Sequence, residues 1–218
     1  MRLVVFDVDG TLVDSQDHIH HAMSFAFKEA GLTPLPKARV LTIVGLSLPV
    51  AVAELAPEAD VQTQARIVSG YKDSFMRARL ERAAPLYPGA MDCLDQLAAR
   101  DDLLLAVATG KSRRGLDAMI TAHGLQGRFI SLQTADGHPS KPHPSMLLAA
   151  LAETGAEASR SVMVGDTSFD MLMARAAGVQ GFGVSWGYHP VRALTDAGAA
   201  QVACDFDTLT RTIEEWAE

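Results

Sequence analysis

Two aspartates lie one residue apart at the end of a short apolar run near the start of the chain. The run Leu3–Phe6 leads into Asp7 and Asp9, and Gly10 follows. Side chains at positions i and i+2 of an extended segment point to the same side, so we expect the two carboxylates to lie close together where a buried strand ends. Close carboxylates repel each other unless they share a proton or hold a cation. Such a pair is suited to hold a divalent cation and to act on phosphate, although aspartates here could also cap the next helix.

Other polar side chains follow the other apolar runs of the chain. They are Thr109, Gly110 and Lys111 after residues 103–108, Lys141 after residues 129–132, and Asp166 and Asp170 after residues 161–165. Taken singly, Thr109 and Asp166 could cap helices, and Lys141 could be a solvated surface lysine. Ligands of open parallel sheets bind at the carboxyl ends of the strands, so together these residues predict one site that handles phosphate.

Short apolar runs alternate with helix-like stretches from Arg100 onward. Including residues 3–6, strands are predicted at 103–108, 129–132, 161–165, 179–184 and 201–203, and helices at 112–123, 144–153 and 168–177. Near-continuous apolar runs suit strands that are buried on both faces of a parallel sheet. The alternation therefore predicts an α/β fold with a doubly wound parallel sheet.

Residues 15–84 break this alternation, because they contain helical patterns and no convincing strand. One helix is predicted from Ser15, as its cap, to Ala30. A second helix carries an apolar stripe that includes Val61, Val68 and Phe75. We predict a helical cap domain at 15–84, inserted into a core domain formed by 1–14 and 85–218.

Composition narrows the classes of function. The 218 residues are 48% hydrophobic and 21% charged, and the formal net charge is −7. An acidic chain is a poor general binder of nucleic acid, which needs a basic face. There is no apolar run of membrane-spanning length and no signal-peptide pattern at the N-terminus. Cys93 and Cys204 are isolated, which is typical of free thiols in a reducing, cytoplasmic setting.

The motifs resemble those of haloacid dehalogenase superfamily phosphatases, and most closely the phosphoglycolate phosphatase-like branch. The segment Asp7–Thr11 matches the first motif of that family, Thr109 the second, Lys141 the third and Gly165–Asp170 the fourth. The resemblance extends over essentially the whole chain, including the position of the helical cap.

This resemblance implies a role for each motif residue. Asp7 would be the nucleophile and Asp9 the general acid and base. Magnesium would be held by the Asp7 carboxylate, the Asp9 main-chain carbonyl and Asp166. Asp170 would support Lys141 or the metal shell. The implied reaction is magnesium-dependent hydrolysis of a small phosphate monoester through an aspartyl phosphate, with phosphoglycolate as the first substrate to consider.

Physical chemistry supports these roles and adds candidates for substrate binding. The ammonium of Lys141 and a metal ion can neutralise phosphate, and the hydroxyl of Thr109 can orient a phosphoryl oxygen. Gly110 and Lys111 follow Thr109 and are candidates for contact with substrate, although a solvated helix face is the simpler interpretation of Lys111. The turn that contains Gly45 and Ser47 either faces substrate or only joins two helices. The partner would be a small phosphorylated metabolite, and the protein a monomer or homodimer.

Several alternatives remain open. A sugar phosphomutase of this superfamily has a catalytic histidine in the first cap helix, where Ile19 stands here between His18 and His20. A pyrophosphatase or nucleotidase would use the same motifs. A phosphoacceptor signalling domain also clusters carboxylates, a threonine and a lysine, but its motif order differs. A catalytically silent binding protein of this fold is the non-enzyme alternative. The histidines at 18, 20 and 21 could hold a second metal, although ordinary cap residues are the simpler interpretation.

Overall fold

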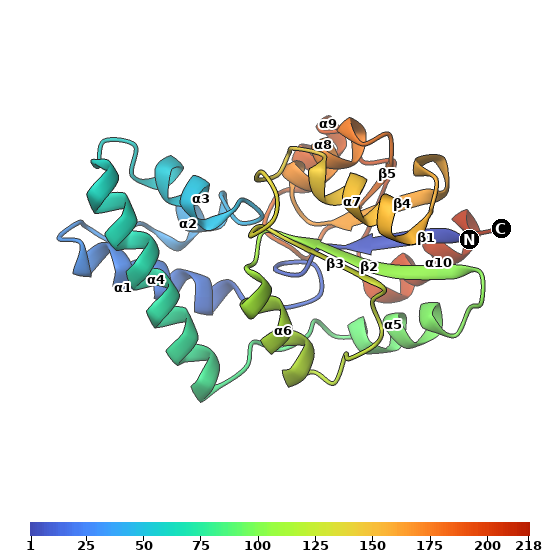
Figure 1. The fold of residues 1–218 in the computed structure, drawn as a ribbon, viewed down its shortest axis with the longest axis horizontal. Coiled ribbons are helices and arrows are strands. Elements are labelled where there is room, and N and C mark those ends of the chain that lie inside the picture. Colours follow the sequence, from blue (N-terminus) through green and yellow to red (C-terminus); the bar gives the residue numbers. More distant parts are fainter.

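Six strands form a single sheet in the computed structural model of the chain, which describes residues 1–218 (Figure 1). The strands are β1 (Arg2–Phe6), β2 (Leu103–Thr109), β3 (Ser131–Thr134), β4 (Ser161–Gly165), β5 (Gln180–Val184) and β6 (Gln201–Ala203). Their order in the sheet is β3-β2-β1-β4-β5-β6, and all neighbours are parallel. The order reverses at β1, so the predicted doubly wound α/β fold is confirmed, and ligands of such sheets bind at this switch point.

Helices cover both faces of the sheet. One face packs against α5 (Ala90–Ala98), α6 (Arg113–Ala122) and α10 (Phe206–Trp216), and the other against α7 (Ser145–Thr154) and α8 (Ser168–Ala176). A short helix α9 (Val191–Asp196) packs beside α8, and a 3₁₀ turn η1 (Ala158–Arg160) precedes β4. The side chains of β1 alternate between the two cores, with Val4 and Phe6 on one face and Leu3 and Val5 on the other. The continuous apolar run of β1 follows from this burial on both sides.

Four further helices lie between β1 and α5, to the left in Figure 1. These cap helices are α1 (Gln16–Glu29), α2 (Lys37–Leu41), α3 (Leu48–Leu55) and α4 (Val61–Glu81). They bury a hydrophobic cluster of their own, which includes Met23, Val52 and Ile67. The chain leaves and re-enters the core through paired segments, because Asp14 N donates to Pro85 O at 2.9 Å. The domain boundaries at 14/15 and 84/85 stay a prediction.

Two details of the sequence analysis were wrong. The third strand begins at Ser131 rather than Phe129, and Phe129 packs in the core just before it. β3 is an edge strand, so polar side chains are tolerated there, and Gln133 Nε2 donates to Ser131 Oγ at 2.8 Å. In α4, Val61 is 84% exposed and Ile67 is fully buried. Val61 is the first residue of that helix, next to its N-cap, and the packed stripe is centred further along.

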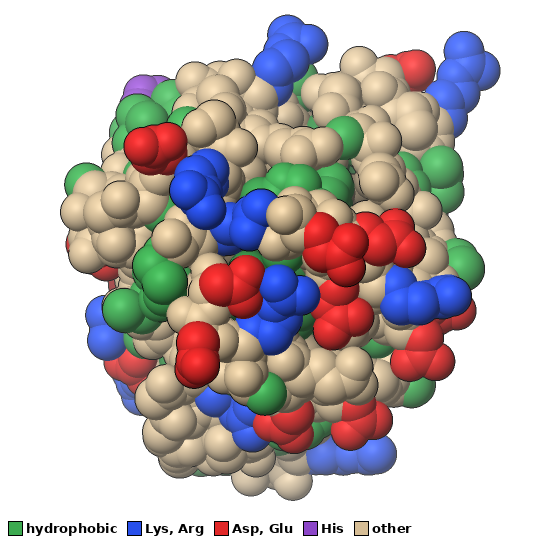
Figure 2. All heavy atoms as spheres, turned by 90° about the vertical axis from the view of Figure 1, so that its right-hand side faces the viewer, with side chains coloured by type: hydrophobic (Ala, Val, Ile, Leu, Met, Phe, Trp, Pro, Cys, Tyr) green, Lys and Arg blue, Asp and Glu red, His purple; other side chains and the backbone are tan.

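The end of the molecule opposite the cap helices carries both signs of charge. Figure 2 shows acidic and basic side chains intermixed on this face. Asp102 pairs there with Arg100 at 2.9 Å and with Arg2 at 3.7 Å. Such exposed pairs contribute little to stability. Separately, none of the helices combines the length and the apolar character that crossing a membrane requires.

The substitution Ile67→Ala is expected to lower the free energy of unfolding by about 2–5 kcal/mol, because it removes buried methyl groups and leaves a cavity. Val61→Ala in the same helix is the matched control, since that side chain is 84% exposed. Urea unfolding followed by circular dichroism measures both variants. A loss for Ile67→Ala as small as that of the control would show that the cap cluster contributes little to stability.

Candidate active site

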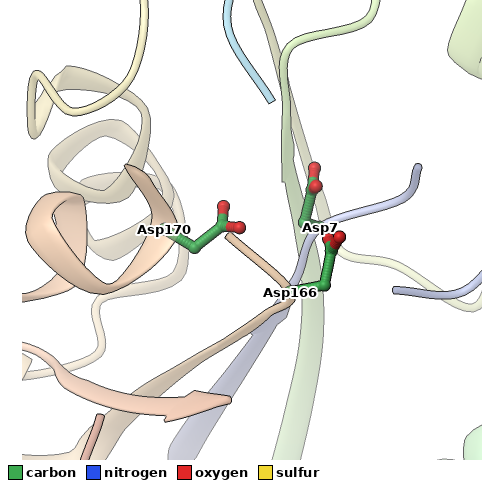
Figure 3. A group of neighbouring side chains, drawn as sticks. All are labelled: Asp7, Asp166 and Asp170. Atoms are coloured by element: carbon green, nitrogen blue, oxygen red, sulfur yellow. The ribbon is translucent and has the colours of Figure 1, made fainter. Parts of the chain in front are cut away.

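Three buried aspartates converge at the carboxyl ends of β1 and β4 (Figure 3). Asp7 follows β1, Asp166 follows β4, and Asp170 lies in the first turn of α8. The three residues offer carboxylate oxygens that all lie within 4.8 Å of one another. β1 and β4 are parallel neighbours, with Phe6 opposite Val164, so the residues that follow the two strands meet. The register of the sheet thus forces negative charge together.

Lys141 is the single buried cation beside these carboxylates. Its Nζ donates to Asp170 Oδ1 at 2.6 Å and lies 2.9 Å from Asp7 Oδ1. Burial lowers the pKa of the Lys141 ammonium, but the charges of Asp170 and Asp7 outweigh this and raise its pKa above the ordinary value. Lys141 is therefore charged and buried, and not the solvated surface lysine that its sequence context alone would allow.

One ammonium does not compensate three carboxylates. Burial raises the pKa of Asp7 to about 6, with Lys141 opposing the rise and Asp170 adding to it. Burial also raises the pKa of Asp166 well above its ordinary range, and the charges of Asp170 and Asp7 contribute further. Both shifts have the same cause, which is negative charge held close together and away from water.

The cluster fits a hard divalent cation. Asp7 is 1% exposed, and neither of its carboxylate oxygens accepts a hydrogen bond, because the contact with Lys141 is an ion pair by distance only. Buried polar atoms normally have hydrogen-bond partners, but the only cationic group beside these oxygens is the Lys141 ammonium. Carboxylate oxygens are the donors that magnesium prefers. Asp7, Asp166 and Asp170 each offer an oxygen close enough to share such an ion.

Asp9 lies in a different environment from Asp7. Ser15 Oγ donates to Asp9 Oδ1 at 2.5 Å, and Lys111 Nζ donates to its two oxygens at 2.6 and 2.7 Å. The hydroxyl of Tyr188 lies 3.0 Å from Ser15 Oγ. The Asp9 side chain is 13% exposed. Asp9 is thus oriented by hydrogen bonds and neutralised by a lysine.

Two sequence interpretations are corrected by these contacts. Ser15 stands at the N-terminus of α1, but its side chain makes no capping hydrogen bond and binds Asp9 instead. Lys111 is not part of a solvated helix face. α6 begins only at Arg113, so Lys111 lies in the preceding loop and its side chain, 11% exposed, turns back to Asp9.

Backbone and side-chain contacts fix Asp166 in place. Thr11 Oγ1 donates to Asp166 Oδ1 at 3.0 Å, and Tyr188 N donates to Oδ2 at 2.8 Å. Gly10 has φ +84°, and a Cβ there would lie 2.2 Å from Asp166 Oδ2, so this turn requires glycine. Asp166 does not cap α8, since Thr167 does so in a capping box with Asp170.

Thr109 ends β2 and is 1% exposed. It does not cap α6, because Ser112 Oγ accepts from Gly115 N at 3.2 Å and performs that function. Lys111 N donates weakly to Thr109 Oγ1, at 3.3 Å. β2 lies beside β1, so Thr109 and Asp7 emerge at the same edge of the sheet.

A cavity of about 540 Å³ separates this edge from the cap helices. Most residues predicted to act on substrate line it: Asp7, Asp9, Thr109, Gly110, Lys111, Gly45 and Ser47. Lys141, Asp166 and Asp170 do not line the cavity and lie behind Asp7. The site therefore has an open wall that faces ligand and a buried charged support behind that wall.

The cap turn Val44–Ser47 faces the cavity and also contacts the core. Ser47 N donates to Ser140 Oγ at 2.8 Å. A Cβ on Gly110 would lie 2.6 Å from the carbonyl oxygen of Gly45. The turn is therefore more than a connection between two helices, because its backbone packs against core loops.

The histidines near the start of α1 do not gather into a site. His18 Nε2 lies 2.9 Å from Arg82 O, and His20 Nε2 lies 3.4 Å from Leu35 O. The two partners belong to different segments of the chain. His18 and His20 therefore serve as structural residues of the cap. His18 also packs near the ring of Phe75, at 6.2 Å between centroids.

The sequence analysis missed several residues that the structure brings to the site. Tyr188 lies outside every motif of the sequence, yet its hydroxyl reaches Ser15, 173 positions earlier in the chain. Tyr71 and Arg79, on the α4 stripe with Phe75, line the cavity. Helical spacing revealed that a stripe exists, but spacing alone does not distinguish a stripe packed in a core from one that faces ligand.

Asp7→Asn is expected to stabilise the metal-free protein at neutral pH. Burial raises the pKa of Asp7 from 3.8 to about 6, so the folded state binds this proton more tightly than the unfolded chain. That favourable contribution is complete below about pH 3.8 and is lost as the pH rises through about 6. Asparagine avoids this loss, so the gain of the variant over wild type in EDTA should grow across that range.

Thermal unfolding at several pH values measures this gain, and Asp101→Asn, at an exposed turn, is the control. Magnesium chloride is expected to raise the midpoint of the wild type more than that of Asp7→Asn, because a bound cation relieves the repulsion. Equal midpoints for wild type and Asp7→Asn at every pH in EDTA would contradict the interpretation that burial of the Asp7 carboxylate destabilises the metal-free protein.

Comparison with known proteins places the chain in a family. A family model described as haloacid dehalogenase-like hydrolase matches residues 4–184. The "Probable phosphatase IndB" of Dickeya dadantii is 36% identical over 93% of this chain and 89% of that protein. A phosphoglycolate phosphatase of Rhodospirillum rubrum is 35% identical over 95% of this chain and 89% of that protein.

Solved structures agree with this placement. A crystal structure of a hydrolase from Pseudomonas syringae superposes with a TM-score of 0.88 at 27% identity and covers 99% of both chains. The architecture is thus shared from end to end, cap helices included. The chain belongs to the haloacid dehalogenase-like hydrolase family, and within it is a phosphatase similar to the phosphoglycolate phosphatases.

Proposed function

We propose that this phosphatase hydrolyses small phosphate monoesters with magnesium and through an aspartyl phosphate on Asp7. The observation that carries the proposal is the Asp7 carboxylate, which accepts no hydrogen bond, lines the cavity, and has Lys141 beside it. A carboxylate without hydrogen-bond donors is better able to act as a nucleophile. Asp9, on the same wall, supplies a second carboxyl group for proton transfer.

In the first step, a carboxylate oxygen of Asp7 forms a bond to phosphorus while the ester P–O bond breaks. The leaving oxygen takes a proton from the Asp9 carboxyl group and departs as an alcohol. In the second step, Asp9 takes a proton from water, whose oxygen bonds to phosphorus. The bond between phosphorus and Asp7 then breaks, which releases inorganic phosphate and restores both carboxyl groups. Splitting the reaction in this way lowers each barrier.

The remaining residues serve charge and orientation. Asp7, Asp166 and the main-chain carbonyl of Asp9 would hold magnesium, which would neutralise the phosphoryl oxygens. Lys141 adds a fixed positive charge that Asp170 holds in place at 2.6 Å. Thr109, at the edge of the sheet beside Asp7, would orient a phosphoryl oxygen. Ser15 keeps Asp9 directed at the cavity through its 2.5 Å hydrogen bond.

One observation favours hydrolysis over a sugar phosphomutase reaction. Ile19 lines the cavity, and no histidine does. A one-residue error in aligning the chain with the mutases would put His18 or His20 in the place of Ile19. Both of these side chains lie beside carbonyl oxygens of residues that do not line the cavity. A histidine of the kind that the mutases place in the first cap helix is therefore missing from the wall. The relatives named phosphoglycolate phosphatase make phosphoglycolate the first ester to test.

Asp9→Asn is expected to hydrolyse alkyl phosphates about 10²–10⁴-fold more slowly than the wild type, because proton transfer is lost. A nitrophenyl phosphate, whose leaving group needs no proton, should still phosphorylate Asp7 and then stall. Stopped-flow detection of nitrophenolate should show a burst equal to the enzyme concentration. Asp7→Asn should show neither burst nor turnover. Wild-type turnover of alkyl phosphates by Asp9→Asn, or of any ester by Asp7→Asn, would refute the assignment.

Gly110→Ala is expected to lower kcat/KM about tenfold or more, which corresponds to about 1.4 kcal/mol. The added Cβ would lie 2.6 Å from Gly45 O and 2.7 Å from Leu46 O, so the cap turn would have to move away from the core. Gly137→Ala is the control, because nothing lies within 4 Å of its added Cβ. Steady-state kinetics with one ester compares them, and equal activity would show that the docked turn is not needed.

A further inference from the structure

The cavity is larger than the smallest phosphate esters require. Its volume of about 540 Å³ falls within the roughly 300–1,000 Å³ typical of sites that enclose drug-sized ligands. Glycolate, once its phosphate occupies the position beside Asp7, would leave most of this space to water. The size of the cavity therefore indicates a bulkier leaving group.

One part of the lining of this space, formed by α1, α3 and α4, is aromatic and apolar. Tyr71 and Phe75 are one helical turn apart on α4, and their rings stack with 5.6 Å between centroids and 19° between planes. Ile19 and Met23 of α1 and Leu48 of α3 complete this wall. Sugars and short acids gain little from such a lining, whereas a planar apolar group buries its faces against it.

Two arginines lie beyond the aromatic pair. Arg79 is one further turn along the same stripe of α4, lines the cavity and is half-buried. Arg114, on the first turn of α6, also lines the cavity, and its Nη2 lies 3.0 Å from Met76 Sδ. The cavity lining therefore combines an aromatic pair with two arginines, and Lys111 Nζ lies 5.0 Å from the centroid of the Phe75 ring.

Neither arginine forms an ion pair, although the chain has 26 acidic against 19 basic residues. Lys111, in contrast, is neutralised by Asp9. Asp73 and Asp136 also line the cavity, but neither forms an ion pair with these arginines, and Asp136 Oδ2 accepts from Arg113 N. Guanidinium groups pair well with carboxylate or phosphate oxygens, so two unpaired ones in the cavity lining are suited to an anion.

We propose that the substrate is a phosphate monoester whose leaving group is a planar, largely apolar body that carries a second negative charge. The planar body lies against Tyr71 and Phe75, and its anionic group reaches Arg79 and Arg114. This inference rests on the proposed phosphatase reaction and adds the class of ester. Arg79 and Arg114 are specificity residues and touch no reacting atom.

The test uses three esters, of which the two aryl esters have similar leaving groups and differ in the second charge. Phenyl phosphate has the planar body alone, 4-carboxyphenyl phosphate adds the second charge, and phosphoglycolate has the charge without the planar body. For the wild type with magnesium, kcat/KM should be highest for 4-carboxyphenyl phosphate, by about tenfold over each of the others. A preference for phosphoglycolate over both aryl esters would overturn the inference.

Substitutions test which residues are responsible for the preference among the three esters. Arg79→Gln should lower the ratio of kcat/KM between the carboxyphenyl and phenyl esters about tenfold, and Arg114→Gln should act in the same direction. Arg77→Gln is the matched control, because Arg77 is exposed on the same helix and does not line the cavity. Phe75→Leu should lower the ratio of phenyl phosphate to phosphoglycolate. If the ratio of kcat/KM between the carboxyphenyl and phenyl esters is the same in Arg79→Gln and Arg114→Gln as in Arg77→Gln, the two arginines do not form an anion subsite.

Failure of this inference is distinct from failure of the proposed function. If the wild type hydrolyses all three esters without preference, the substrate class is wrong and the phosphatase reaction stands. If none of the three is hydrolysed with magnesium present, binding of each to the wild type is measured by calorimetry. Equal affinity for the two aryl esters would then overturn the substrate class as well.

Discussion

The repulsion among three buried carboxylates is the interaction on which the rest of this structure depends. The parallel register of β1 and β4 brings Asp7 and Asp166 together, and the first turn of α8 adds Asp170. The protein tolerates this charge through Lys141 and through contacts that hold Asp166 and Asp170 in place. The charge that remains uncompensated would favour the magnesium ion proposed above. The same repulsion would then both weaken the metal-free fold and strengthen binding of the metal.

Asp7 and Asp9 illustrate how environment separates two identical side chains. Asp7 is buried next to other carboxylates, and neither of its oxygens accepts a hydrogen bond. Asp9 is held at the cavity wall by hydrogen bonds from Ser15 and Lys111. Because they are two residues apart on an extended segment, both side chains reach the same cavity. Their different neighbours suit them to the different roles proposed above.

The number of strands and most of their positions along the chain could be predicted from the sequence, because burial on both faces leaves continuous apolar runs such as β1. β3 was placed two residues early, since an edge strand mixes polar and apolar residues. The motif residues could be grouped because they follow strands. The contacts of Ser15 with Tyr188 and of Lys111 with Asp9 could not be predicted. These partners lie 173 and 102 positions apart, and no local spacing in the sequence indicates them.

The docking of the cap turn onto the core has a consequence for how such a protein can change. The turn meets the core largely through its main chain, with carbonyl oxygens of Gly45 and Leu46 against Gly110 and the amide of Ser47 on Ser140. Main-chain atoms are the same whatever side chains the turn carries. New residues at cavity-lining positions can therefore reshape the space for the leaving group while the cap turn keeps its contacts with the core. Substrate selectivity can thus change in evolution without loss of the contact between cap and core.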